Sequence, residues 1–181
     1  MTEITVRAAR EDDADELAAL DLHYDASRVL RLEREGAGAE TAFRFRWMVQ
    51  NAPPSVYAEY APEQLRGAIG RVDAFFVAEH LGELAGLLMI IIPGWTDAGE
   101  ITDLAVGREH RRSGAGRALV DAAIAFAHGR GLRALWVEPR SDNAAAIDFY
   151  LALGFRLSGF NDRMYGVAGD GDVTLFMYLN L

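Results

Sequence analysis

The sequence predicts a single α/β domain built around a mixed sheet, and three observations support this prediction. Strand-like alternation recurs along the chain, apolar residues at helical spacing lie between the alternating runs, and glycines and prolines separate the segments. Antiparallel-looking strands come first and strand–helix–strand units follow, which is typical of a mixed sheet with helices on its faces. Because 181 residues suit one domain with its own core, we expect one domain over residues 1–181.

The first half of the chain begins with an alternating run and an amphipathic helix, and strands follow. Three acidic residues, Glu11, Asp12 and Asp13, stand in the first turn of the helix and suit its N-terminal dipole. Pro62 stands at a tolerated first-turn position of a second helix, and Leu81-Gly82 separates two β-rich runs as a hairpin turn does. The expected strands are residues 4–8, 29–35, 42–48, 73–80 and 83–92, and the expected helices are residues 10–22 and 62–69.

The second half of the chain alternates strands with helices. Gly129 and Gly131 end one helix, Asn143 caps the next and Gly154 ends it. The expected strands are residues 100–106, 133–138, 155–160 and 173–181, and the expected helices are residues 114–128 and 143–153.

Composition excludes several classes of protein. With 51% hydrophobic and 25% charged residues the chain is globular, and its longest apolar run, Leu87 to Pro93, is too short to span a bilayer. We therefore expect a cytoplasmic protein with no membrane partner. The net charge of -9 disfavours nucleic acid and favours a cationic substrate. Monomer and homodimer both stay open.

Metal and thiol chemistry are not expected. The chain has no cysteine, which excludes disulfides, thiolate metal sites and cysteine nucleophiles. Its four histidines show none of the spacings typical of metal ligands. We therefore expect no metal.

The segment Arg111-Arg112-Ser113-Gly114-Ala115-Gly116-Arg117 joins an expected strand to an expected helix. Free backbone N–H groups at a helix start, carried by small residues, form an anion site that the helix dipole assists. The arginines add positive charge to an acidic protein, which indicates a diphosphate. An ordinary solvated glycine loop is the alternative. The segment lacks the Gly-Lys-Ser/Thr of a P-loop, and Leu119 stands where the dinucleotide motif requires a third small residue.

Two blocks together resemble the GNAT superfamily of N-acetyltransferases. Leu104-Ala105-Val106 followed by Arg111-x-x-Gly114-x-Gly116 is similar to its acetyl-CoA signature, and Asn143 to Tyr150 with Gly154-Phe155 is similar to its second block. The resemblance covers about residues 73–181 and implies a mixed, mostly antiparallel sheet of about seven strands with about four helices. It also implies acetyl-CoA as the cosubstrate.

Within that superfamily the chain resembles the streptothricin acetyltransferase branch. The shared features are Trp95 before the strand Ile101 to Val106, the segment Asp162-Arg163-Met164-Tyr165, and the closing Phe176-Met177-Tyr178. The chain departs from that branch at Val137 to Ser141 and has no cysteine before Phe149. The acceptor is therefore not established by this resemblance.

The resemblance assigns roles to individual residues. The backbone of Leu104, Ala105 and Val106 is expected to pair with the pantetheine arm as an added strand. Arg111, Arg112, Ser113, Gly114, Ala115, Gly116 and Arg117 are expected to hold the pyrophosphate, and Asn143 to touch the pantetheine.

Tyr150 is expected to hydrogen-bond the departing thiolate. It lies seven residues after Asn143, about two helical turns along the same face, so both can reach one ligand. Full proton transfer from a phenol to a thiolate is uphill by about 2 kcal/mol, which favours hydrogen-bond stabilisation over protonation. An ordinary core position for Tyr150 is the alternative.

The acceptor amine must lose a proton, at a cost of about 4.6 kcal/mol at pH 7 for an ordinary ammonium. We expect Glu100 to act as the base and Asp103 to anchor the substrate ammonium, and Trp95 to contact the substrate. Alternation predicts that Glu100 and Asp103 lie on opposite faces of the strand, so that only one faces the substrate. Solvated edge charges, or a water relay, remain alternatives.

The sequence therefore predicts an acetyl-CoA-dependent N-acetyltransferase acting on a primary amine of a small cationic molecule. An aminoglycoside- or streptothricin-like antibiotic is one such acceptor. Acetylation of a protein lysine or N-terminus, and a non-catalytic acetyl-CoA-binding module, are the alternatives.

Overall fold

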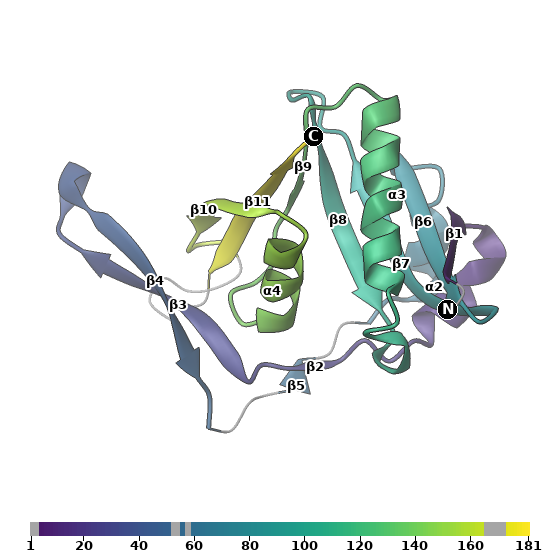
Figure 1. The fold of residues 1–181 in the computed structure, drawn as a ribbon, viewed down its shortest axis with the longest axis horizontal. Helices are drawn as coiled ribbons and strands as arrows, with labels where there is room; N and C mark the ends of the chain where they lie inside the picture. The colour runs from purple at the N-terminus through teal and green to yellow at the C-terminus, as the bar shows by residue number, and fades with distance from the viewer. Residues whose placement is uncertain (1–3, 52–54, 57–58, 165–172) are drawn as a thin grey trace. The chain divides into compact units, whose positions relative to one another are not determined.

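The computed structural model describes residues 4–51, 55–56, 59–164 and 173–181 (Figure 1). Seven strands form a mostly antiparallel mixed sheet in the order β1-β6-β7-β8-β9-β11-β10. Its strands are β1 (Ile4–Ala8), β6 (Ala74–His80), β7 (Glu83–Ile91), β8 (Ala98–Val106), β9 (Ala134–Val137), β10 (Arg156–Asn161) and β11 (Thr174–Asn180). The helices are α1 (Ala14–Ala18), α2 (Pro62–Ala68), α3 (Ala115–Gly129) and α4 (Ala144–Ala152). The predicted fold class is confirmed.

The chain forms two compact units. The first unit comprises residues 1–23, 57–136 and 179–181, and the second comprises residues 24–56 and 137–178. The prediction of one domain over residues 1–181 stays a prediction.

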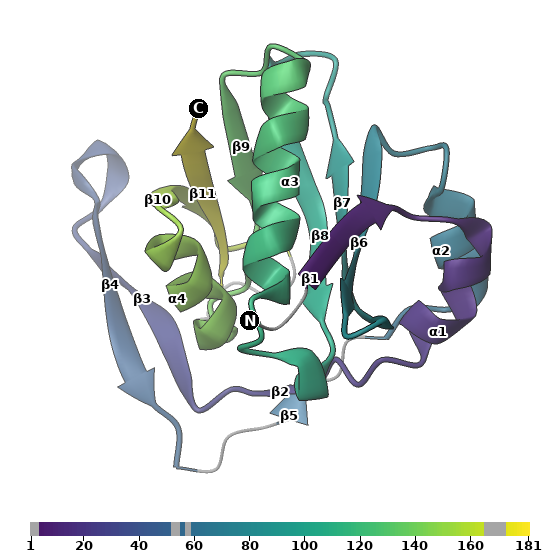
Figure 2. The ribbon, with the colours of Figure 1, turned by 45° about the vertical axis from the view of Figure 1, so that its right-hand side comes forward.

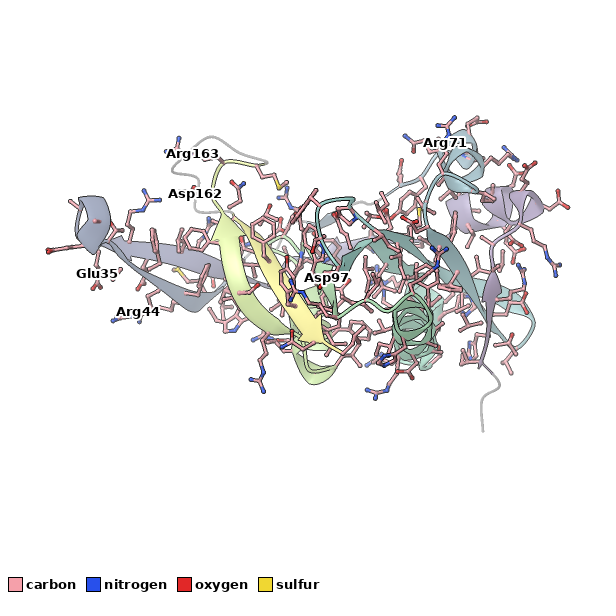
Figure 3. All side chains as sticks on the ribbon, turned by 90° about the horizontal axis from the view of Figure 1, so that it is seen from above. Glu35, Arg44, Arg71, Asp97, Asp162 and Arg163 are labelled. Atoms are coloured by element: carbon pink, nitrogen blue, oxygen red, sulfur yellow. The ribbon has the colours of Figure 1, made fainter. Side chains whose placement is uncertain are left out.

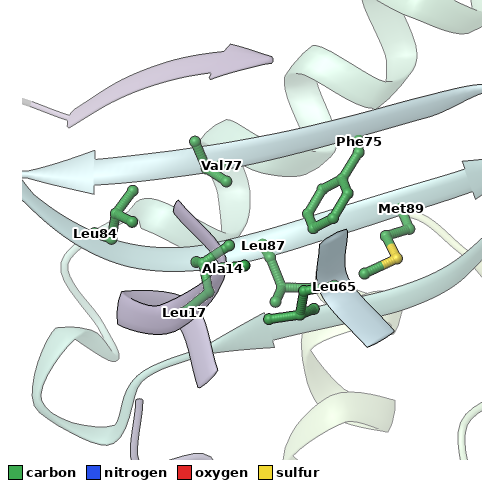
Figure 4. Close-up of a cluster of buried hydrophobic side chains, with 8 residues drawn as sticks. All are labelled: Ala14, Leu17, Leu65, Phe75, Val77, Leu84, Leu87 and Met89. Carbon is green, nitrogen blue, oxygen red and sulfur yellow. The ribbon is translucent and has the colours of Figure 1, made fainter. Parts of the chain in front are cut away.

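In the first unit, helices cover both faces of β6 and β7. Phe75 and Val77 of β6 join a buried cluster with residues of α1, α2 and β7, namely Ala14, Leu17, Leu65, Leu84, Leu87 and Met89 (Figure 4). Between them along β6, Phe76 points the other way and meets Phe126 of α3 edge-on, with the ring centroids 6.2 Å apart. Side chains of a strand alternate between its faces, so α1 and α2 cover one face and α3 covers the other.

The predicted hairpin of β6 and β7 forms around Leu81 and Gly82. Both residues have positive φ, 56° and 88°, and this is the backbone conformation that a tight two-residue turn requires. Leu81 is an unusual choice for such a position because its Cβ disfavours positive φ.

The helix expected over residues 10–22 is shorter than predicted. A 3-10 turn, Glu11–Asp13, leads into α1, which ends at Ala18. Asp13 is responsible for the local geometry, because its carboxylate accepts from the Arg10 backbone and from two nitrogens of Arg7 on β1. The hydrogen bond from Arg7 lowers the pKa of Asp13.

The second unit contains a long hairpin of β3 (Arg28–Glu35) and β4 (Ala42–Val49), as predicted. A short pair, β2 (Tyr24–Asp25) and β5 (Ser55–Val56), flanks it in the chain. The rings of Phe43 and Phe45 pack edge-on against Phe160, at 4.9 and 5.4 Å between centroids. Arg44 and Glu35 lie near the hairpin tip (Figure 3), and Arg44 Nη1 is 3.9 Å from Glu35 Oε1.

Gly86 of β7 lies where β7 and β8 approach closely. A Cβ on Gly86 would lie 2.4 Å from the carbonyl oxygen of Ala105, and this atom is backbone that cannot rotate away. The register at the end of β8 therefore depends on the missing side chain.

We expect Gly86→Ala to lower the free energy of unfolding by about 2 kcal/mol, because overpacking forces the β7 and β8 backbones apart. Gly129→Ala is the matched control. A Cβ on Gly129 meets no atom within 4 Å, and alanine favours helix over glycine. Urea unfolding of both variants measures the difference, and equal stabilities would contradict this account of the close approach.

Candidate active site

Strand β8 carries one extra residue relative to β7. Met89 lies opposite Asp103 and Ile90 lies opposite Ile101, so Thr102 has no partner on β7. This is a β-bulge, in which two residues of one strand oppose one residue of the other. The alternation of side chains along β8 is therefore shifted by one residue at Thr102.

The bulge places Glu100 and Asp103 on the same face of the sheet. Glu100 lies opposite Ile91 and Asp103 opposite Met89. Ile91 and Met89 are two apart on an unbulged stretch, and residues directly opposite each other share a face. The prediction that alternation sends the two carboxylates to opposite faces is wrong. Thr102 is an extra residue in β8, and it shifts the alternation of the side chains by one position. Met89 belongs to the cluster with α1 and α2, so this is the α1/α2 face.

Strand β8 also separates from its other neighbour. The parallel pairing with β9 covers only Ala98, Gly99 and Glu100. Among the residues that the structure describes, no strand pairs with the outer edge of β8 from Ile101 to Val106. An unpaired edge in the middle of a sheet is a template for another extended chain. Pairing of Leu104, Ala105 and Val106 with the pantetheine arm stays a prediction.

The segment after β8 contains amides without partners. Gly114 is the N-cap of α3 with φ of 102°, and it supplies no side-chain cap. The Ala115 amide donates to Ser113 Oγ at 3.3 Å and the Ala118 amide to the Gly114 carbonyl. For the Gly116 and Arg117 amides, no acceptor lies within hydrogen-bond distance in the described part of the chain. Two free donors at the start of a 15-residue helix suit an anion.

The arginines of this turn lie in different environments. Arg111 donates to two backbone carbonyls, those of Val106 at 3.2 Å and Leu22 at 3.1 Å. It therefore ties the turn to the end of β8. Arg112 and Arg117 are exposed, and Arg112 adopts a φ of 64°. The exposed pair can supply positive charge beside the free amides.

Helix α4 carries the two candidate residues of the second unit. Asn143 is its N-cap, and its Oδ1 accepts from the Ala146 amide at 3.1 Å. Its side-chain oxygen is thus used to start the helix, and the side-chain N–H groups are the part suited to a ligand. Tyr150 is buried, with its ring 5.5 Å from Phe149 and 5.2 Å from Phe155. The core role that was the alternative for Tyr150 is therefore real, and a catalytic role stays a prediction.

Glu138, which the sequence analysis did not single out, has an unusual environment. It directly follows β9 and is half-buried, and none of the residues described with it forms an ion pair or hydrogen bond with its carboxylate. Burial raises the pKa of Glu138 above its usual value. A half-buried carboxyl with a raised pKa is a candidate acid or base. The signal available in the sequence was a carboxylate at the end of a buried strand.

Trp95 lies in the connection between β7 and β8, and 79% of its surface is exposed. It precedes the end of β8 that carries Glu100. Two aromatic residues from the early part of the second unit, Tyr24 and Trp47, have partners within that unit. Arg28 lies over the Trp47 ring at 4.2 Å, and the Tyr24 hydroxyl reaches Asp142 at 3.4 Å. Desolvation raises the pKa of Tyr24 to about 12. Tyr57 and Tyr165 lie outside the described residues.

Each unit contains its own group of candidate site residues. The first unit contains Trp95, Glu100, Asp103, the β8 edge at residues 104–106 and the turn at residues 111–117. The second unit contains Asn143 and Tyr150 on α4, with Glu138 before it. Among the described residues, no group of three or more His, Asp or Glu side chains could hold a metal ion. None of the described helices is long and apolar enough to cross a membrane.

An open β8 edge followed by a helix start with free amides suits an extended, phosphate-bearing ligand. Residues 41–155 match the model of the acetyltransferase (GNAT) family. This match spans more than half of the chain, and the chain belongs to the GNAT family of acetyltransferases.

Several relatives are similar over most of the chain. Streptothricin acetyltransferase of Streptomyces lavendulae is 30% identical over 94% of this chain and 92% of its own length. A crystal structure of nourseothricin acetyltransferase matches with a TM-score of 0.82 and 31% identity over 98% of both chains. A candidate streptothricin acetyltransferase from Bacillus anthracis, solved with acetyl coenzyme A, has a TM-score of 0.76 at 19% identity over 99% of this chain and 100% of its own.

A different branch matches part of the chain. The ribosomal protein bS18-alanine N-acetyltransferase of Escherichia coli K12 is 34% identical over 46% of this chain and 56% of its own length. Relatives of the family thus bear the names of enzymes with small-molecule and with protein acceptors.

We expect the stability of Glu138→Gln relative to the native chain to increase with pH. The folded pKa is raised, so the folded state disfavours the carboxylate, and the native chain loses stability as pH rises from about 4.3 through the folded value. Glutamine does not titrate and avoids this loss.

Thermal unfolding at pH 5 and pH 8 measures the difference. Glu83→Gln, which changes an exposed glutamate, is the matched control. A relative stability of Glu138→Gln that falls with pH would contradict this account of burial.

Proposed function

We propose that this acetyltransferase moves an acetyl group from acetyl-CoA to a primary amine of a small cationic molecule. The observation that carries the proposal is the unpaired edge of β8, which leads directly into the turn with the free Gly116 and Arg117 amides. An extended arm that ends in a diphosphate satisfies both features with one ligand.

The residues of this chain suit the two ends of such a donor. Arg112 and Arg117 supply charge to the diphosphate while the amides of the turn donate to its oxygens. Arg111 holds the turn against β8 through the Val106 and Leu22 carbonyls. The backbone of Leu104 to Val106 pairs with the pantetheine arm, and the Asn143 side-chain N–H groups donate to it. When bound, acetyl-CoA supplies an acyl group activated as a thioester.

Carboxylates and one phenol are the groups that would accept or donate protons in the reaction. The acceptor nitrogen must be deprotonated before it forms a bond to the acyl carbon. We assign Glu100 as the base and Asp103 as the anchor for substrate charge, with Trp95 as a further contact. Tyr150 donates a hydrogen bond to the thiolate that leaves. Glu138 is the rival base, because its burial raises its pKa toward the range in which a carboxylate accepts a proton effectively.

The small cationic acceptor is supported by charge and by relatives. The net charge of -9 attracts cations. Streptothricin acetyltransferase of Streptomyces lavendulae covers nearly the whole chain, whereas the bS18-alanine enzyme covers less than half of it. A streptothricin-like antibiotic is therefore the first acceptor to try. Transfer to a protein amine is the second candidate, and the partial match to the bS18-alanine enzyme favours it.

The test is thiol release from acetyl-CoA in the presence of streptothricin, an aminoglycoside, a polyamine, lysine or a basic peptide. The chain has no cysteine, so a thiol reagent reacts only with the thiol of the released coenzyme A. We expect turnover with a small cationic amine and a fall of about 100-fold in kcat for Tyr150→Phe. Tyr178→Phe, the same change on β11, is the matched control and should retain activity.

Each outcome decides between the functions. Turnover with the basic peptide alone would replace the small-molecule proposal with protein acetylation. Binding of acetyl-CoA without turnover on any amine would contradict the enzyme and support a binding module. A loss of turnover in Glu138→Gln, with Glu100→Gln active, would move the base to Glu138.

A further inference from the structure

Tyr60 is tied to the candidate site by its hydroxyl. It lies two residues before α2, and its ring packs against the buried cluster of α1, α2, β6 and β7. The hydroxyl donates to Asp103 Oδ1 at 2.8 Å, across 43 residues of sequence. A rigid aromatic ring thus fixes the position of the donor, and the donor fixes one carboxylate oxygen on β8.

The Tyr60 hydrogen bond leaves the charge of Asp103 intact. Asp103 is half-buried, and in the described ranges no arginine or histidine lies within ion-pair distance of it, nor is there a hydrogen bond to its Oδ2. A phenol donates one hydrogen bond and brings no positive charge to the carboxylate. A carboxylate can accept several hydrogen bonds. Asp103 therefore presents an open carboxylate oxygen in a fixed orientation.

We propose that Tyr60 is a positioning residue that orients Asp103 to bind a second cationic group of the acceptor, apart from the amine that is acetylated. The inference rests on the proposed function and adds a specificity determinant to it. It predicts a preference for acceptors with two cationic groups over those with one.

The bulge at Thr102 makes this division of roles possible. Because Glu100 and Asp103 share a face, one acceptor can approach both. The β7 residues opposite them, Ile91 and Met89, are two residues apart, which is about 6 to 7 Å along a strand. We expect a similar separation between the backbones of Glu100 and Asp103. A diamine with a short methylene spacer can reach across such a separation. Glu100 can then accept the proton of the reacting amine while Asp103 holds the other cation.

The experiment compares 1,4-diaminobutane with 1-aminobutane, which differ by one ammonium group. Calorimetry measures the binding of each to the protein saturated with coenzyme A, so it does not depend on turnover. We expect the native chain to bind the diamine about tenfold more tightly. Asp103→Asn should abolish the preference, and Tyr60→Phe should remove most of it.

Two further variants separate positioning from a merely structural role. The double variant Tyr60→Phe/Asp103→Asn should lose no more preference than Asp103→Asn alone, because the hydroxyl acts only through that carboxylate. Thr5→Val removes another hydroxyl-to-carboxylate hydrogen bond, from Thr5 to Glu79 at 3.2 Å, and should keep the full preference. Thermal unfolding of each variant reports any loss of fold.

Equal binding of the two amines by the native chain, or an undiminished preference in Tyr60→Phe, would overturn the inference. A tenfold preference that depends on Tyr60, in a protein that acetylates no amine of the panel, would instead refute the proposed function and leave the binding role of Tyr60 and Asp103 standing. The two failures are thus distinguishable.

Discussion

The extra residue Thr102 in β8 is the constraint on which the candidate site of the first unit depends. It turns Asp103 to the face that carries Glu100, and it lies within the stretch where β8 no longer pairs with β9. A regular strand would send the carboxylates to different faces. The stretch around the bulge therefore has both an open backbone edge and two carboxylates on one face, which are the features that the proposed function uses for the donor and the amine.

The rest of the first unit holds this strand in place. Gly86 lets β7 and β8 approach at the end of β8 that leads to the turn before α3. Figure 2 shows the chain passing from the end of β8 through a short turn into α3. Arg111 holds this turn through two carbonyls, close to the free amides of Gly116 and Arg117 at the start of α3. On the opposite face from α3, the cluster of Leu65, Met89 and their neighbours supports Tyr60. Packing on one face and hydrogen bonds on the edge thus act on the same strand.

Features encoded locally could be predicted from the sequence. The strands, the helices α2, α3 and α4 and the turn before α3 depend on alternation, helical spacing and glycines a few residues apart, and they lie close to where these patterns place them. Helix α1 begins later than predicted, after a 3-10 turn in which Asp13 bonds Arg7 and Arg10, and periodicity does not encode these contacts.

Features that depend on a partner far along the chain could not be predicted. A bulge is defined only against the opposite strand, so Thr102 looks like any other residue of an alternating run. The Tyr60–Asp103 hydrogen bond joins segments 43 residues apart. The raised pKa of Glu138 comes from burial, which one strand alone does not establish. For the same reason the two carboxylates of β8 were expected on different faces.

The most direct test of the central claim, that the edge of β8 and the turn before α3 bind the donor, is amide hydrogen exchange with and without acetyl-CoA. The account predicts slower exchange over residues 101–106 and 113–118 on addition of acetyl-CoA, with residues 74–80 of β6 unchanged. Exchange over residues 101–106 that does not respond to acetyl-CoA would contradict it, even if the turn at residues 113–118 were protected.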